Sequence, residues 1–243
     1  MKPNFTPKKK RTRGGVAFWD HEYTHAEHLA LSERESGDLA KFCRWLVRRN
    51  RTDILSPDGS AIDIGCGNGR NLIYLAREFG LPGIGLDISR AAITQASRAS
   101  TELPISYRVA SAAEPLPAAD GSQTLALDMM SSHFLDHAGR ERLRDEIFRV
   151  LAPGGYLFMK TFLRDGDKHT ERLLTEHPGG EPGSYRHPVL KVDEHAYCEE
   201  ELLSFLRERF SVSKVYRSHK HTFRGQARKR RTIALYVEKD LRA

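Results

Sequence analysis

A glycine-rich turn carries the residues in this chain that are best suited to bind a nucleotide. The turn reads Asp63-Ile-Gly65-Cys66-Gly67-Asn68-Gly69 and follows a short apolar run. Glycines let a ligand approach the backbone without a Cβ in the way, and the free amides of a following helix would face that ligand. A second apolar run ends at Asp87, whose carboxylate can accept hydrogen bonds from both hydroxyls of a ribose. We expect a ligand where these runs end, because open α/β sheets bind ligands at the carboxyl ends of their strands.

The glycine spacing favours one kind of cofactor over another. Dinucleotide enzymes use G-x-G-x-x-G, whereas here the third glycine, Gly69, comes one position early and is followed by Arg70. Asp63 precedes the first glycine by two residues, where it could hold a zwitterionic amino-acid group. A nicotinamide-dependent oxidoreductase stays open as an alternative, as does a glycine turn that binds no ligand.

A second set of candidates follows the expected fourth strand, in Asp128-Met-Met-Ser-Ser-His133-Phe-Leu-Asp-His137. The ordinary pKa of histidine, about 6.5, suits a general base, so His133 is the candidate catalytic residue. The alternative is that His133 only packs against its own loop. His133 and His137 have i, i+4 spacing, but no third ligand stands nearby, so we expect no metal site.

Strands and helices alternate along the region that must position these residues. Apolar runs predict strands over 60–65, 82–87, 105–110, 124–129 and 155–162, and periodic stripes predict helices over 36–49, 68–79, 89–100 and 139–151. A helix over 199–210 precedes strands over 212–216 and 232–237, which no helix separates, so they should form a hairpin. The fold class is therefore α/β, a doubly wound and mostly parallel sheet with one antiparallel strand near the end and helices on both faces.

Domain boundaries follow from composition. Residues 1–15 combine basic residues with Pro and Gly-Gly, which predicts a disordered basic tail. Residues 16–243 should form a single domain, with an N-terminal helical cap over 16–50 and a structureless lid insertion over 163–194. We expect the four histidines in this region and directly after it to be solvated, and Tyr185 and Arg186 are weaker candidates to touch a substrate. The histidines are His169, His177, His187 and His195.

The 243 residues carry a net charge of +7, and all of that excess lies in two short segments. Residues 1–13 hold six basic side chains and residues 214–231 hold eight, with no acid in either, so the basic 214–231 hairpin could bind an anionic partner. No run approaches the ~20 apolar residues that cross a bilayer, and the first residues lack the apolar core of a secretion signal. Three scattered cysteines predict neither a disulfide framework nor a zinc site, which favours a cytoplasmic location.

Several ordered motifs resemble the class I S-adenosylmethionine-dependent methyltransferase family. AIDIGCGNGRNLIYLA resembles its glycine motif, GIGLDIS its acidic second strand, and LRDEIFRVLAPGGYLFMK its helix–Pro-Gly-Gly–strand segment. The resemblance covers residues 58–162 and implies a seven-stranded sheet with an antiparallel last strand. It places the glycines against the methionine part of the donor with Asp63 nearby, Asp87 on the ribose and Ile88 on the adenine. The implied donor-binding residues are Asp63, Gly65, Cys66, Gly67, Asn68, Gly69, Asp87, Ile88, Ser111, Ala112 and Asp128.

Departures from the family pattern bear on the adenine contact and on the methyl acceptor. Ser111-Ala112-Ala113-Glu114 stands where many relatives place an Asp, so Ser111 or a backbone group must contact the adenine amine. The Asp/Asn-Pro-Pro-Tyr/Phe motif of one type of adenine methylase and the nucleophilic cysteine of cytosine C5 enzymes are both absent. The acceptor is a small molecule or RNA, and a non-catalytic RNA-binding module on the same fold is a further alternative. Phe18, Trp19 and Tyr23 resemble the N-terminal aromatic segment that covers the donor in relatives, although ordinary packing would also account for them.

Overall fold

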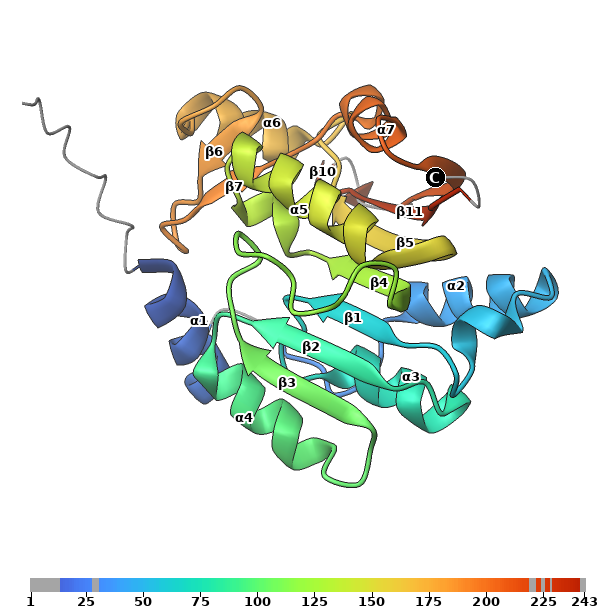
Figure 1. Ribbon diagram of the computed structural model, residues 1–243. Coiled ribbons are helices and arrows are strands. Elements are labelled where there is room, and N and C mark those ends of the chain that lie inside the picture. The colour runs from blue at the N-terminus through green and yellow to red at the C-terminus, as the bar shows by residue number, and fades with distance from the viewer. Residues whose placement is uncertain (1–13, 28–30, 219–221, 224–225, 228, 241–243) are drawn as a thin grey trace, which may run out of the picture.

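A seven-stranded mixed sheet forms the centre of the protein (Figure 1). This computed structural model describes residues 14–27, 31–218, 222–223, 226–227 and 229–240. The sheet order is β3-β2-β1-β4-β5-β11-β8, and β11 is antiparallel to both of its neighbours while the remaining pairs are parallel. The strands are β1 (Ala61–Ile64), β2 (Gly83–Asp87), β3 (Ile105–Val109), β4 (Gln123–Met129), β5 (Leu151–Phe162), β8 (Ser211–Arg217) and β11 (Thr232–Glu238). The predicted fold class and the terminal hairpin are confirmed.

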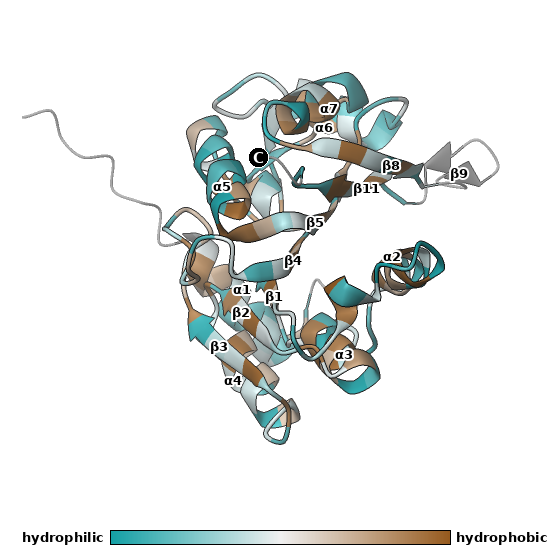
Figure 2. Ribbon diagram, turned by 45° about the vertical axis from the view of Figure 1, so that its right-hand side comes forward, coloured by the Kyte–Doolittle hydropathy of each residue, from teal (hydrophilic) through white to brown (hydrophobic). Residues whose placement is uncertain are grey.

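Helices cover both faces of this sheet. Figure 2 shows α2 and α3 on one side of the central strands and α5 on the other. The α2 and α3 side chains share one apolar cluster, whereas those of α5 and α7 share the other. The helices are α1 (Gly14–His25), α2 (Gly37–Arg48), α3 (Arg70–Phe79), α4 (Arg90–Ala99), α5 (His137–Val150), α6 (Lys168–Glu176) and α7 (Glu199–Arg207), with 3₁₀ turns η1 (Thr52–Leu55) and η2 (Ser132–Phe134).

The periodic stripe of α2 explains how that helix docks. Leu39, Phe42, Cys43 and Leu46 recur at helical spacing and are all buried. The Phe42 ring stacks on Phe158 of β5 at 5.2 Å between centroids. Aromatic pairs of this kind contribute about 0.5–1.5 kcal/mol beyond the area they bury.

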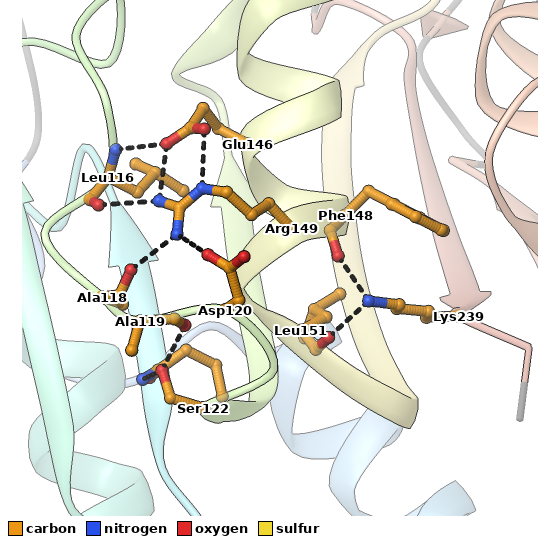
Figure 3. Close-up of polar contacts among 11 residues, drawn as sticks. Leu116, Ala118, Ala119, Asp120, Ser122, Glu146, Phe148, Arg149, Leu151 and Lys239 are labelled. Atoms are coloured by element: carbon orange, nitrogen blue, oxygen red, sulfur yellow. Dashed lines mark hydrogen bonds and ion pairs between the residues drawn. The ribbon is translucent and has the colours of Figure 1, made fainter. Parts of the chain in front are cut away.

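The end of α5 is fixed to the connection that precedes β4 (Figure 3). Arg149 donates to the Glu146 carboxylate at 2.8 Å and to Asp120 Oδ1 at 2.7 Å, while Glu146 also accepts from the amide of Leu116. Lys239 Nζ donates to the carbonyls of Phe148 and Leu151, which lie at the carboxyl end of α5. The Lys239 bonds satisfy carbonyls at the end of α5. The Arg149 and Glu146 bonds hold the 110–122 connection against that end of the helix.

The expectation of a structureless lid over 163–194 is wrong. This region contains α6 and the antiparallel pair β6 (Ser184–Arg186) and β7 (Asp193–His195). Asp167 caps α6 by accepting from the amides of His169 and Thr170, and the Tyr185 side chain is fully buried. Three-residue strands are too short to show a periodic pattern, which explains why the sequence did not reveal them.

The N-terminal boundary also differs from the prediction. α1 begins at Gly14, so the last two residues of the expected tail are helical, while residues 1–13 lie outside the described part of the chain. β5 begins at Leu151, where a helix end was expected, because Leu151 already pairs with Gln123 ahead of a register shift. The short pair β9 (Thr222–Phe223) and β10 (Gln226–Ala227) lies between β8 and β11 in the sequence. Across the described ranges, no helix has the length and apolarity to cross a bilayer, and no three His, Cys, Asp or Glu side chains are grouped as metal ligands.

Candidate active site

Three buried carboxylates mark the point where the strand order of the sheet reverses. β1 lies between β2 and β4: the chain passes from β1 through β2 to β3 on one side, and then crosses back to place β4 on the other side of β1. Asp63 lies on β1, Asp87 ends β2 and Asp128 lies near the end of β4, and all three side chains are buried. Ligands of open α/β sheets bind at such a switch point, so the candidate residues converge where the fold provides a site.

The loop after β1 depends on its glycines. Gly65, Gly67 and Gly69 have φ of 72°, 55° and 76°, a left-handed conformation that other residues rarely adopt. A Cβ at Gly65 would lie 2.4 Å from Ser131 Oγ, and one at Gly67 would lie 2.2 Å from the Tyr23 hydroxyl. The loop therefore needs glycine for its conformation and for the close approach of neighbouring groups.

Asp87 joins the end of β2 to this loop. One carboxylate oxygen accepts from the amide of Gly67 at 2.9 Å, and the other accepts from the amide of Ser89 at 2.8 Å. Burial raises the pKa of Asp87, while these backbone bonds act in the opposite direction. Each carboxylate oxygen has two lone pairs, so acceptor capacity remains for the two hydroxyls of a ribose.

Asp63 provides a test of whether the site fits a donor with a positively charged amino group. Its Oδ2 is buried and has no hydrogen-bond partner in the described part of the chain. Burial, followed by the charge of Asp87, raises the pKa of Asp63 to about 7. An unpaired buried carboxylate costs several kcal/mol, and an ammonium group would supply the missing donor. The residues present therefore fit S-adenosylmethionine.

The other predicted donor-binding residues lie on the glycine loop, directly after β2 and β3, or on β4. Cys66 is buried beside Gly85, where a built Cβ would lie 2.9 Å from its sulfur. Asn68 turns outward and donates to the carbonyl of Ser32 at 3.1 Å. Ser111 accepts from the amide of Ala113. Ile88 and Ala112 are half-buried, and Asp128 accepts from the amide of Ser132 at 3.1 Å.

Helix α1 covers the glycine loop, and the sequence did not reveal how it is attached. Asp20 accepts from the Ser89 hydroxyl at 2.7 Å and from the amide of Ala91 at 3.1 Å, so α1 caps the start of α4. The backbone carbonyl of Tyr23 accepts from the side-chain amide of Gln95, which lies on α4. The Trp19 ring contacts Phe134 of η2 at 5.4 Å, edge to face. Figure 1 shows α1 beside α4 at this end of the sheet, so a donor must displace Tyr23 or share the loop with it.

Removing the Asp20 carboxylate should loosen this cover. We expect Asp20→Ala to cost about 1 kcal/mol, the usual effect of losing a helix cap, and to expose the α1 amides while the sheet stays protected. Hydrogen exchange read by mass spectrometry measures this, with the exposed Asp58→Ala as the matched control. Equal α1 protection in the two variants would show that Asp20 does not hold the helix.

His133 lies in η2, which α1 contacts through the Trp19–Phe134 ring pair. The side chain is buried, and neither ring nitrogen has a hydrogen-bond partner within the described ranges. Its ring meets Phe162 of β5 edge to face at 5.2 Å. Burial is the main cause that lowers the pKa of His133 to about 4, and Glu194 opposes it while Arg230, His195 and Arg140 add to it. His133 is therefore neutral near pH 7.

The buried Glu194 and the partly buried Arg230 form an ion pair beside His133 that the sequence did not predict. Glu194 Oε2 accepts from Arg230 Nη1 at 2.7 Å and from the Tyr185 hydroxyl at 2.5 Å. The Arg230 guanidinium lies over the Phe162 ring, 3.3 Å from its centroid. This contact with Phe162 places Arg230, near the end of the basic 214–231 segment, beside the candidate residue His133. No local motif links these residues, because they come from three distant segments.

The weaker candidates in the 163–194 region separate into buried and exposed groups. The prediction that all four histidines are solvated is wrong for His195, which is buried and bonds Glu201 Oε1 at 2.7 Å. Tyr185 points at Glu194 as described, whereas the exposed Arg186 pairs with Asp193 at 3.3 Å. Glu201 lies in the first turn of α7, and its hydrogen bond with the His195 ring explains why His195 is buried.

Comparisons with known proteins show that this chain is similar to S-adenosylmethionine-dependent methyltransferases. The profile of the family described as "Methyltransferase domain" matches residues 61–155. A SAM-dependent methyltransferase from Methanosarcina mazei has 26% sequence identity and a TM-score of 0.66, with 80% of this chain and 97% of that chain covered.

Two curated relatives show similarity over parts of their length. Phthiotriol/phenolphthiotriol dimycocerosates methyltransferase 1 from Mycobacterium ulcerans is 33% identical over 157 residues, 64% of this chain and 56% of that protein. Glycine/sarcosine/dimethylglycine N-methyltransferase from Actinopolyspora halophila is 28% identical over 216 residues, 82% of this chain and 37% of that protein. The chain spans about half the length of the first curated relatives it matches.

Proposed function

We propose that this protein transfers a methyl group from S-adenosylmethionine to a small-molecule acceptor by in-line displacement. The observation that carries the proposal is the unpaired, buried Oδ2 of Asp63 beside the glycine loop and Asp87. The bound donor would supply an activated methyl on its sulfonium. Asp63 would hold its amino group, Asp87 its ribose and Ile88 its adenine.

The chain contributes mainly by aligning the reactants and excluding water. Orientation and proximity can supply on the order of 7–11 kcal/mol of barrier reduction. Tyr23 and Trp19 of α1 contact the glycine loop and η2, respectively, so α1 would shield a bound donor from water on this side. His133 is neutral near pH 7, so one ring nitrogen can accept the proton of an acceptor that must lose one.

The proposal favours a small molecule over RNA. The two curated relatives named above carry lipid and amino-acid acceptors in their names. Within the basic 214–231 segment, Arg217 is paired with Glu199 and Arg230 is turned inward to Glu194. These two cations are thus engaged within the protein, which weakens the expectation that the segment binds an anionic partner. The cytoplasmic location and the single-domain organisation stay predictions.

Isothermal titration with S-adenosylmethionine and with S-adenosylhomocysteine tests the proposal. We expect both to bind, and reduced nicotinamide dinucleotide not to bind. Incubation of radiolabelled donor with fractionated extract, with and without ribonuclease, then tests the acceptor class, and label should appear in small molecules. No binding of either donor form would contradict a methyltransferase, and ribonuclease-sensitive label would overturn the small-molecule assignment.

The lowered pKa of His133 gives a prediction about stability that can be tested without knowing the methyl acceptor. In the unfolded chain a histidine titrates near 6.5, so the unfolded state takes up a proton first and stability falls as the pH drops from 6.5 to 4. This loss can reach about 3 kcal/mol. His133→Gln should remove it, as chemical denaturation at several pH values would measure, with the half-buried His177→Gln as control. Identical pH profiles for wild type and His133→Gln would contradict a buried neutral His133.

A further inference from the structure

The Arg230 guanidinium has one edge that the protein leaves without a good partner. Nη1 binds Glu194 at 2.7 Å, and Nη2 reaches Thr170 Oγ1 only at 3.5 Å, beyond the usual 2.7–3.2 Å. Nε is buried and has no hydrogen-bond partner in the described part of the chain. Because Nε and Nη2 lie on the same edge of the planar group, the unpaired edge has the geometry that binds two oxygens of a carboxylate.

One carboxylate and two aromatic rings hold the Arg230 guanidinium in place. Glu194 is buried, and its pKa is lowered by the charge of Arg230, so it is ionised and anchors Nη1. Phe162 lies against one face of the guanidinium, and Tyr185 lies 5.3 Å from its carbon. The guanidinium is therefore fixed in position with its Nε–Nη2 edge free of any other carboxylate among the described residues.

The same place holds a second unpartnered group. Both ring nitrogens of His133 are buried without partners among the described residues, and His133 and Arg230 contact the same Phe162 ring. Arginine N–H groups can only donate, so the missing partner at Arg230 must be an acceptor atom. A group with two oxygens and a single negative charge can accept from both N–H groups of this Arg230 edge. A dianion would be repelled more strongly by the nearby carboxylate of Glu194.

We propose that Arg230 is a specificity-determining residue and that the methyl acceptor carries a carboxylate, bound by the Nε–Nη2 edge of Arg230 beside His133 and Phe162. This inference rests on the proposed methyltransferase function and names the substrate class of that site. Glu194 and Tyr185 act as positioning residues through Arg230. The carboxylate anchors the acceptor, and the proposal assigns no bond-making step to Arg230.

Calorimetry in the presence of saturating S-adenosylhomocysteine tests this proposal. The probes are benzoate, 4-hydroxybenzoate, octanoate and sarcosine, each compared with its amide. Arg230→Lys keeps a charge opposite Glu194 and removes the two-point edge, and Arg217→Lys is the matched control at an exposed arginine–glutamate pair. We expect at least one acid to bind the wild type, and both its amide and the Arg230→Lys variant to bind about 10- to 100-fold more weakly.

The outcomes separate this proposal from the proposed function. S-adenosylhomocysteine should bind wild type, Arg230→Lys and Arg217→Lys equally, which also shows that the variants fold. Donor-product binding without any acid binding, or acids and amides binding alike, would overturn the carboxylate assignment and leave the methyltransferase standing. An equal effect of Arg217→Lys would likewise overturn it. Failure of S-adenosylhomocysteine to bind the wild type would instead contradict the proposed function.

Discussion

Asp87→Ala is expected to weaken S-adenosylhomocysteine binding by about 10²- to 10⁴-fold. Two hydrogen bonds from ribose hydroxyls to a carboxylate contribute about 1.5–3 kcal/mol each, which gives that range. The variant also loses the acceptor for the amides of Gly67 and Ser89, so the glycine loop loses part of its support. Calorimetry measures the affinity, and thermal unfolding measures the cost to the fold.

Two further variants keep this prediction falsifiable. Asp87→Asn retains one acceptor oxygen and should lie between wild type and Asp87→Ala in affinity. Asp58→Ala changes an exposed acid before β1, at the opposite end of that strand from the glycine loop, and should bind as the wild type does. A folded Asp87→Ala protein with an affinity within threefold of wild type would show that Asp87 does not hold the ribose.

Asp63→Asn is expected to stabilise the donor-free protein by about 2–4 kcal/mol at pH 8. The folded-state pKa of Asp63 is about 7, whereas an unfolded aspartate titrates near 3.9. The folded state therefore holds the proton more tightly, and stability falls as the pH rises from 4 to 7. Asparagine has nearly the same shape and no charge, so it removes this loss. Denaturant unfolding at pH 5 and pH 8 measures the difference, which at pH 5 should be about a third of its value at pH 8.

The same substitution should weaken donor binding about 10- to 100-fold, because the amino group loses its charged partner. Donor binding to the wild type should release a proton below pH 7, which calorimetry in buffers of different ionisation enthalpy detects. A gain in stability without a loss of affinity would mean that the ammonium binds elsewhere. No gain in stability at pH 8 would mean that Asp63 is already paired.

Asp63 and His133 act on stability in opposite directions over almost the same pH range. Lowering the pH from 7 to 4 favours the fold through Asp63 and disfavours it through His133. The wild-type profile should therefore be flatter than that of either variant. Asp63→Asn should reveal the acid sensitivity caused by His133, and His133→Gln should reveal the alkaline sensitivity caused by Asp63.

The parts of the molecule that sequence could predict are those built from contiguous patterns. The glycine turn, the acid that ends the second strand and the periodic stripe of α2 each lie within one short segment, so spacing alone located them. Asp20 and Ser89 are joined only through the packing of α1 on α4. Glu194 and Arg230 are joined across 36 residues. Such pairs depend on tertiary structure, and no local pattern in the chain specifies them.

The short β6–β7 pair was missed for a related reason. Three-residue strands do not alternate long enough to be distinguished from a polar loop. Burial of Tyr185 and His195 between the insertion and the rest of the domain, rather than local propensity, explains why this region is ordered.

The position of the Tyr23 side chain over Gly67 has a consequence for the order in which cofactor and product are released. The helix that carries Tyr23 also touches η2 through Trp19, so a movement of α1 that frees the glycine loop would also break its contact with η2. We therefore expect an ordered cycle in which cofactor enters first and departs last. Movement of one short N-terminal helix, rather than methyl transfer itself, would then limit the rate, and Asp20→Ala would quicken the release of spent cofactor.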